Sequence, residues 1–185
     1  MRRQQEFSVA RPQSGALVSE RDHVQGPERA RLTLLEYADY ECPYCGEAHP
    51  VVKRLQKGFG GDLRFVFRNF PLADIHPNAM LAAQAAEAAD LQGKFSQMHD
   101  LILEKQDLLE PGIIPIWAEQ VGLDLEKFRT DIRRGAATGR IKEDLKSGMD
   151  SGVDGTPAFF INGERYLGVP DYETLREALR DTSAT

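Results

Sequence analysis

Cysteine is scarce in this chain, which has only two, Cys42 and Cys45, among 185 residues. So small a number excludes the disulfide framework that staples many small secreted domains. A bridge between residues only three positions apart closes a very short loop and adds little stability through chain entropy. The pair therefore calls for a chemical explanation.

Long apolar stretches are also missing, and none approaches the roughly 18 residues of a membrane-spanning helix. The basic start, with Arg2 and Arg3, is not followed by the apolar segment of an export signal. We therefore expect a cytoplasmic protein; a chain whose leader had been removed would look the same and would be periplasmic. A formal net charge of −6 argues against general nucleic-acid binding and mainly serves solubility. We expect neither a nucleic acid nor a membrane as partner.

The remaining composition is that of an ordinary globular chain, with 41% hydrophobic and 28% charged residues. The length suits one domain, or one core with a sizeable insertion. Residues 1–25 are polar and lack periodicity, which predicts a mobile N-terminal arm. Whether this arm folds over the core or adds an edge strand stays open.

Hydrophobic patterning predicts an α/β fold with a central mixed sheet flanked by helices. Residues 31–37 and 63–70 are typical of strands, and a one-sided apolar pattern predicts a helix between them. Residues 157–161 and 165–167 form a hairpin around Asn162-Gly163, and a helix capped by Asp171 follows. The predicted sheet is divided between residues 26–73 and 152–185. Residues 74–151 have helical patterns throughout, with Asp124 as the predicted cap of one helix, and are predicted to be an inserted all-helical subdomain.

The sequence Cys42-Pro43-Tyr44-Cys45 stands where the first strand ends and the helix begins. Unpaired N–H groups and the positive end of the helix dipole stabilise a thiolate at this position. The thiolate is the reactive form, so we expect Cys42 to be the attacking group. Pro43 suits the first helical position. Cys45 lies one turn further on and can resolve a mixed disulfide formed at Cys42.

A zinc site is the alternative interpretation of the cysteine pair. Zinc usually takes four ligands, and the sequence has no second pair at this spacing. His49, four residues after Cys45, could serve as a third ligand. The strand, cysteine pair and helix in succession favour redox chemistry, and we expect no metal.

At these residues the chain resembles the DsbA-like branch of the thioredoxin superfamily, over roughly residues 24–181. The resemblance rests on the CPYC motif, on Gly155-Thr156-Pro157 before a late strand, on Pro50 eight residues after Cys42, and on the helical insertion. EYADYECPYC and RNFPL also look like members of this branch. It implies a thioredoxin-like fold and a protein disulfide oxidoreductase.

The resemblance also implies roles for particular residues. Thr156 and Pro157 are expected to form a cis-proline loop that binds an extended substrate together with Pro43 and Tyr44. From the residues alone, Pro157 would simply be the first residue of a strand. Glu36, six residues before Cys42, is implied as a proton acceptor for the buried cysteine. The alternative is a solvated glutamate at a strand end.

Several nearby residues depart from the pattern of a strong oxidant. Glu41 directly precedes Cys42, and a carboxylate there opposes the helix dipole and raises the thiol pKa. Asp39 adds another negative charge. Tyr44 stands where an imidazolium would stabilise the thiolate; with Tyr40 it is expected to form an aromatic rim, or else both are ordinary half-exposed rings. We assign no role to the remaining histidines, which are His23, His76 and His99.

Three functions are consistent with these residues. The first is exchange of dithiol and disulfide with protein thiols and disulfides, which needs no cofactor because the cysteines carry the electrons. The second is a glutathione-coupled, glutaredoxin-like reductase, with Lys53, Arg54 and Arg68 as candidate basic residues. The third is a non-catalytic redox-sensing or binding module. Isomerases and transferases of this fold generally lack the cysteine pair and rank last. Glutathione and a thioredoxin-type protein both remain open as electron partners.

Overall fold

The computed structural model describes residues 18–183, in which five strands form one mixed sheet ordered β1-β3-β2-β4-β5. The strands are β1 (His23–Gln25), β2 (Leu32–Ala38), β3 (Leu63–Asn69), β4 (Ala158–Ile161) and β5 (Glu164–Arg165). Strand β2 is central, since it runs parallel to β3 and antiparallel to β4. All of its residues are buried, as its continuous apolar run requires. The predicted α/β fold is confirmed.

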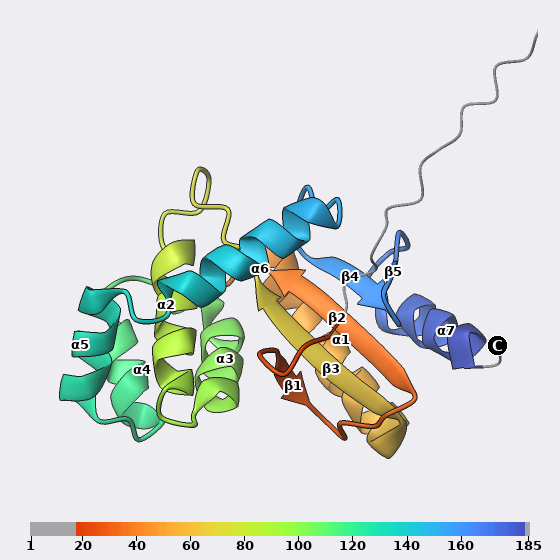
Figure 1. Cartoon of the computed structure of the whole chain (residues 1–185), viewed down its shortest axis with the longest axis horizontal. Coiled ribbons are helices and arrows are strands. Elements are labelled where there is room, and N and C mark those ends of the chain that lie inside the picture. The colour runs from red at the N-terminus through yellow and green to blue at the C-terminus, as the bar shows by residue number, and fades with distance from the viewer. Residues whose placement is uncertain (1–17, 184–185) are drawn as a thin grey trace, which may run out of the picture.

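Seven α-helices accompany the sheet in the described part of the chain. They are α1 (Pro43–Phe59), α2 (Ala79–Asp90), α3 (Phe95–Glu104), α4 (Ile114–Gln120), α5 (Leu125–Arg134), α6 (Thr138–Asp150) and α7 (Tyr172–Ser183). Helices α2 to α6 follow β3 and precede β4; α2 to α5 gather beside the sheet and α6 leads back to it (Figure 1). Short 3-10 turns lie at Gly60–Asp62 and Gln106–Leu108. No helix within residues 18–183 is long and apolar enough to cross a membrane.

The alternation of side chains along β2 divides the core into two parts. Leu34 belongs to the larger cluster, which includes apolar residues of α1 and α7. Leu35 and Tyr37 point to the opposite face, where the Tyr37 hydroxyl lies 2.8 Å from Ser147 Oγ of α6. Glu36 has the same parity as Leu34, so its carboxyl group faces the side covered by α1. The alternation thus directs an acid toward the helix that carries both cysteines.

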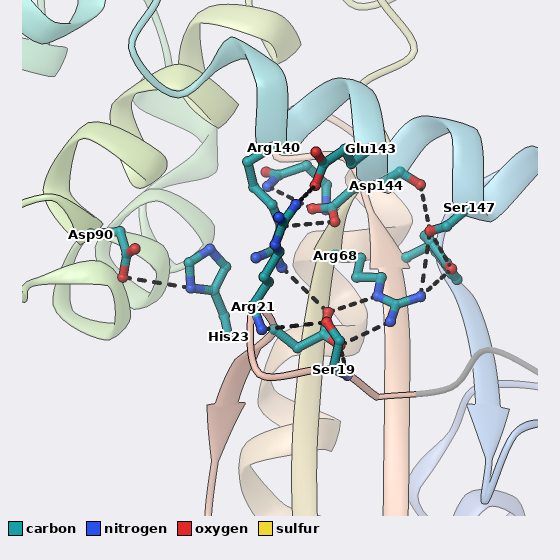
Figure 2. Close-up of polar contacts among 12 residues, drawn as sticks. Ser19, Arg21, His23, Arg68, Asp90, Arg140, Glu143, Asp144 and Ser147 are labelled. Carbon is teal, nitrogen blue, oxygen red and sulfur yellow. Dashed lines mark hydrogen bonds and ion pairs between the residues drawn. The ribbon is translucent and has the colours of Figure 1, made fainter.

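The segment before β2 is part of the fold. Strand β1 pairs antiparallel with β3, and Asp22 bonds to the guanidinium of Arg68 at 2.8 and 2.9 Å and to Arg140 of α6 at 3.3 Å. Figure 2 shows Ser19 and Arg21 beside Arg68 and helix α6, and His23 turned toward Asp90 of α2; His23 also stacks on Phe95. The predicted mobile arm is therefore wrong for residues 18–25, and the prediction for residues 1–17 lies outside the described residues.

Local turn and cap signals were accurate at the ends of elements. Asp124 and Asp171 accept hydrogen bonds from the backbone N–H groups of Lys127 and Thr174, at 2.9 and 3.0 Å. The return strand of the hairpin is shorter than predicted, because β5 ends at Arg165 and Leu167 is 84% exposed. A side chain so exposed gains little from packing in a sheet, which explains why the strand ends before Leu167.

Candidate active site

The cysteine motif forms the first turn of helix α1. Cys42 is the N-cap residue with extended backbone, and Pro43 follows in the first turn, where a missing N–H is harmless. The carbonyl oxygen of Cys42 accepts hydrogen bonds from Cys45 N and Gly46 N at 3.0 and 3.2 Å. The side chain of Cys42 is therefore held at the positive end of a helix of 17 residues.

The electrostatic surroundings favour a thiolate at Cys42. Both cysteines are reduced and buried, Cys42 being 4% exposed. A hydrogen bond with the Cys45 thiol, followed by those with the N–H groups of Cys45 and Tyr44, lowers the pKa of Cys42 to about 5 against the effect of burial. At neutral pH the reactive form of Cys42 therefore predominates.

Cys45 has the opposite environment, one helical turn behind Cys42. Cys45 is 1% exposed, and its sulfur accepts a hydrogen bond from Asp39 N at 3.4 Å. Burial, and then the hydrogen bond with Cys42 and the charge of Glu36, raise the pKa of Cys45 well above its ordinary value. Cys45 keeps its proton in the reduced state and needs an acceptor before it can attack.

Glu36 is placed where such an acceptor is needed. The residue is 3% exposed, and its strand neighbours are Phe67 of β3 and Phe159 of β4. Burial, and then the negative charge of Cys42, raise the pKa of Glu36 to about 8. The alternative of a solvated glutamate at a strand end is therefore wrong, and the role of Glu36 as proton acceptor remains a prediction.

The loop before β4 closes the site from the other side. In its protonated form the Cys42 thiol donates a hydrogen bond to the Thr156 carbonyl oxygen, which lies 3.3 Å from the sulfur, and the Thr156–Pro157 peptide bond is cis. Among the described residues, Thr156 Oγ1 is buried and has no hydrogen-bond partner. The structure thus brings Thr156 and Pro157 to the cysteines across 114 residues of sequence.

Of the two tyrosines predicted to form an aromatic rim, one lies at the surface. Tyr44 is 67% exposed and Pro43 beside it is also exposed, so both can contact a bound chain. Tyr40 is 1% exposed, with its hydroxyl 3.0 Å from His99 Nδ1 in the core. The rim prediction is therefore wrong for Tyr40, because its ring fills space between the sheet and the insertion.

Two carboxylates that the sequence suggested would oppose the thiolate are engaged elsewhere. Asp39 accepts hydrogen bonds from Glu41 N, Leu72 N and His76 Nδ1, each at 2.7 Å. Glu41 accepts hydrogen bonds from the backbone and the side chain of Asn78. Both acids therefore tie the loop before Cys42 to the segment after β3.

A further contact comes from the insertion itself. The Gln106 side-chain amide donates to the carbonyl oxygens of Tyr40 and Cys42, both at 2.8 Å. Sequence reasoning missed Gln106 and His76 as contributors to the site. No local signal marks them, since they lie 64 and 37 residues from the groups they bind, Cys42 and Asp39.

The basic residues suggested for glutathione are occupied by other contacts. Lys53 pairs with Asp100 at 2.6 Å, and Arg54 lies over the ring of Tyr172 at 3.5 Å. Arg68 is 7% exposed and binds Asp22. Their side chains therefore give no support to a glutathione site.

The third ligand of the zinc alternative also points away from the cysteines. His49 Nε2 lies 3.8 Å from Asp100 Oδ1, and the ring of His49 packs edge-on against His99. Burial lowers the pKa of both histidines. Within residues 18–183, no group of three or more metal-ligating side chains includes a cysteine.

Comparisons with known proteins cover nearly the whole chain. A family profile described as Thioredoxin matches residues 18–181. A Na(+)/H(+) antiporter NhaA 3 of Salinispora tropica is 48% identical over 168 residues, which is 90% of this chain and 25% of that protein. An NhaA antiporter of Herminiimonas arsenicoxydans is 41% identical over 158 residues and is likewise covered over 25% of its length. The chain thus spans about a quarter of these relatives.

Several solved structures share the fold of this chain. BdbD from Bacillus subtilis superposes with a TM-score of 0.80 at 23% identity, covering 89% of this chain and 94% of that one. A thioredoxin-like oxidoreductase from Silicibacter pomeroyi gives 0.78 at 26% identity, covering 90% and 95%. The α-DsbA1 of Wolbachia pipientis gives 0.80 at 18% identity, covering 91% and 94%.

Proposed function

This chain belongs to the thioredoxin family, and from that premise we propose that it exchanges disulfides with protein substrates through Cys42 and Cys45. The observation that carries the proposal is the contrast between the two sulfurs. The pKa of Cys42 is lowered to about 5 at a helix N-terminus, whereas the buried Cys45 one turn away keeps its proton. One sulfur is thus ready to attack, and the other is held back for the second step.

In the reductive direction, the Cys42 thiolate attacks one sulfur of a substrate disulfide. A bond forms between Cys42 and that sulfur, and the other substrate sulfur leaves as a thiolate. The product is a mixed disulfide at the N-terminus of α1. The helix dipole and N–H groups that stabilise the thiolate also make Cys42 a good leaving group in the next step.

Resolution requires Cys45 to lose its proton. We assign Glu36 as the acceptor, because formation of the mixed disulfide removes the negative charge of Cys42, one of the two causes that raise the pKa of Glu36 to about 8. A larger fraction of Glu36 is then ionised near neutral pH and able to take the proton of Cys45. The Cys45 thiolate then attacks Cys42, forms the Cys42–Cys45 disulfide and releases the second substrate thiolate. Two electrons have moved from the dithiol to the substrate, and oxidation of a substrate dithiol is the same sequence reversed.

Substrate recognition is assigned to the surface around Cys42. The exposed Tyr44 and Pro43 border the attacking cysteine on one side, and Thr156 and Pro157 border it on the other. The peptide groups of the Thr156 loop suit an extended substrate strand, which pairs through main-chain hydrogen bonds. Protein thiols and disulfides are therefore the substrates we propose, with no cofactor beyond the cysteines.

Serine variants of the two cysteines test the proposal. We expect Cys42→Ser to abolish turnover in reduction of the insulin disulfides by dithiothreitol, because the attacking thiolate is gone. We expect Cys45→Ser to accumulate mixed disulfides with substrate, visible as a mass increase that dithiothreitol reverses. A redox sensor without catalytic function would react once and fail to cycle.

The controls separate these outcomes from unfolding. Circular dichroism should show that both variants keep the wild-type fold, since serine is nearly isosteric with cysteine. Turnover at the wild-type rate by Cys42→Ser would refute the assignment of Cys42. A wild-type protein that reacts with one equivalent of disulfide and then stops would favour the sensor.

A further inference from the structure

The carboxylate of Asp39 is a buried charge directly behind the cysteine motif. Its side chain is 0% exposed and accepts three hydrogen bonds, two of them from backbone N–H groups. A buried carboxylate is costly unless a positive charge balances it. Among the ion pairs of the described residues, the partner of Asp39 is His76, whose Nδ1 lies 2.7 Å from Asp39 Oδ2.

The peptide groups of the same residue contact both cysteines. Asp39 N donates to the sulfur of Cys45 at 3.4 Å, and Asp39 O accepts from Cys42 N at 3.2 Å. A residue anchored through its carboxylate therefore fixes two contacts that orient the reactive turn. Any group that holds the carboxylate also holds this alignment.

We propose that His76 is a positioning residue of the active site, which anchors the cysteine turn through Asp39 and supplies a positive charge that stabilises the Cys42 thiolate. This inference rests on the proposed function, because it concerns the same thiolate. The positive charge thus comes from the segment after β3, because Tyr44 inside the CPYC motif cannot carry a positive charge.

The charged groups around His76 support this role. Burial alone would lower the pKa of His76, but its hydrogen bond with Asp39 and the negative charges of Asp39, Cys42 and Glu41 outweigh burial and raise it above the ordinary value. His76 therefore carries more positive charge at neutral pH than a free histidine. The side chain of His76 is 17% exposed, so its ring can exchange protons with solvent.

The other side chains that hold the turn are neutral. Asn78 binds Glu41, and Gln106 binds the carbonyl oxygens of Tyr40 and Cys42. Either can align the loop, but neither can respond to the charge on a sulfur. A charge effect at Cys42 therefore distinguishes His76 from these purely geometric contacts.

The first test needs no variant. Interaction between two titrating groups is reciprocal, so a thiolate at Cys42 must raise the pKa of His76 as much as His76 lowers that of Cys42. We expect NMR titration of the imidazole resonances to give a higher pKa for His76 in the reduced protein than in the disulfide form. An identical pKa in the two forms overturns the inference.

The second test replaces the charge and keeps the hydrogen-bond donor. His76→Asn retains a side-chain N–H group for Asp39 but cannot be protonated. We expect the pKa of Cys42, followed by thiolate absorbance at 240 nm, to rise by roughly half a unit to one unit. Lys127→Gln is the matched control, because it removes a cation that pairs with Asp131 on α5. We expect this control to leave the Cys42 titration unchanged.

The outcomes separate this inference from the proposed function. A His76→Asn protein with an unchanged Cys42 pKa and normal turnover removes the role of His76 and leaves disulfide exchange intact. If the wild-type protein forms no reversible disulfide, the proposed function itself fails. If His76→Asn does not fold, the NMR comparison of the two wild-type redox forms still decides.

Discussion

Three titrating groups at the cysteine motif have pKa values displaced in different directions by their surroundings. The hydrogen bond with the Cys45 thiol, and then the N–H groups at the helix N-terminus, favour negative charge at Cys42, with its pKa lowered to about 5. Burial of Glu36 and Cys45 favours their protonated forms. Such divergence assigns different tasks to neighbouring groups, since one donates electrons while another holds the proton that must move.

Glu36 has a consequence for stability that is best measured in the disulfide form. Its pKa rises from an ordinary 4.5 to about 8 in the reduced protein. Burial, the main cause, acts in both redox states, whereas the charge of Cys42 is lost in the disulfide, so the pKa of Glu36 stays raised in the oxidised protein but by less. Between the ordinary and the raised pKa the folded protein keeps a proton that the unfolded chain has lost. The free energy of unfolding should therefore fall as pH rises, by at most about 1.4 kcal/mol per pH unit.

We expect Glu36→Gln to flatten this dependence in urea unfolding of the oxidised protein, followed upward from about pH 4.5, the ordinary pKa of a glutamate. The reduced protein is unsuitable, because the lowered pKa of Cys42 makes stability rise with pH above about 5 and offsets the effect of Glu36. An unchanged slope in the oxidised Glu36→Gln protein would show that Glu36 does not hold a proton in this range.

At the scale of elements, helix α6 connects the insertion to the sheet through close contact. Gly148 is buried, and a Cβ atom built there would lie 2.6 Å from Phe70 Cε2 and 3.1 Å from Tyr37 Cδ1. Both rings are fixed in the core, so neither can move aside easily. Gly139, on the same helix, has no atom within 4 Å of such a Cβ.

This contrast predicts opposite effects of the same substitution. Gly148→Ala should lower the free energy of unfolding by about 1–3 kcal/mol through overpacking. Gly139→Ala should leave it unchanged or raise it by up to about 1 kcal/mol, because alanine is the better helix former. Thermal or urea unfolding measures both, and equal stability of the two variants would contradict close packing of α6 on the sheet.

Most of the helices and strands could be predicted from the sequence, because the signals that mark them are local. Asp124 and Asp171 cap helices as their positions suggested, and the apolar pattern after Pro43 gave helix α1. The edge strand β1 stayed undecided in the sequence, since it has three residues and depends on pairing with β3. Nothing in a segment so short indicates a strand until its partner is known.

At the scale of the whole molecule, the active site is assembled from distant segments. The motif alone identified Cys42 and Cys45, and Glu36 and Pro157 came from the family resemblance. The anchoring roles of Asp39, Glu41 and Gln106 could not be predicted, because each contacts a group at least 33 residues away. A charge before the cysteines looked unfavourable until its partners were located.

The N-terminal segment follows the same rule. Asp22 reaches Arg68 across 46 residues and Arg140 across 118, so one carboxylate joins the segment directly before β1, the sheet and helix α6. Both sequence separations are far longer than the period of a helix or a strand, so no local pattern predicts these contacts. A polar run that resembles an arm can therefore be part of the fold once its ion-pair partners are in place.

Redox titration of the Cys42–Cys45 pair tests the central claim most directly. The protein is equilibrated in buffers of defined glutathione ratio, and the remaining thiols are trapped and counted by mass spectrometry. We predict one reversible two-electron transition between dithiol and disulfide, with a midpoint between roughly −270 and −120 mV, the range of thioredoxin-fold catalysts. Failure to form a reversible disulfide at any ratio would contradict disulfide exchange as the function of this site.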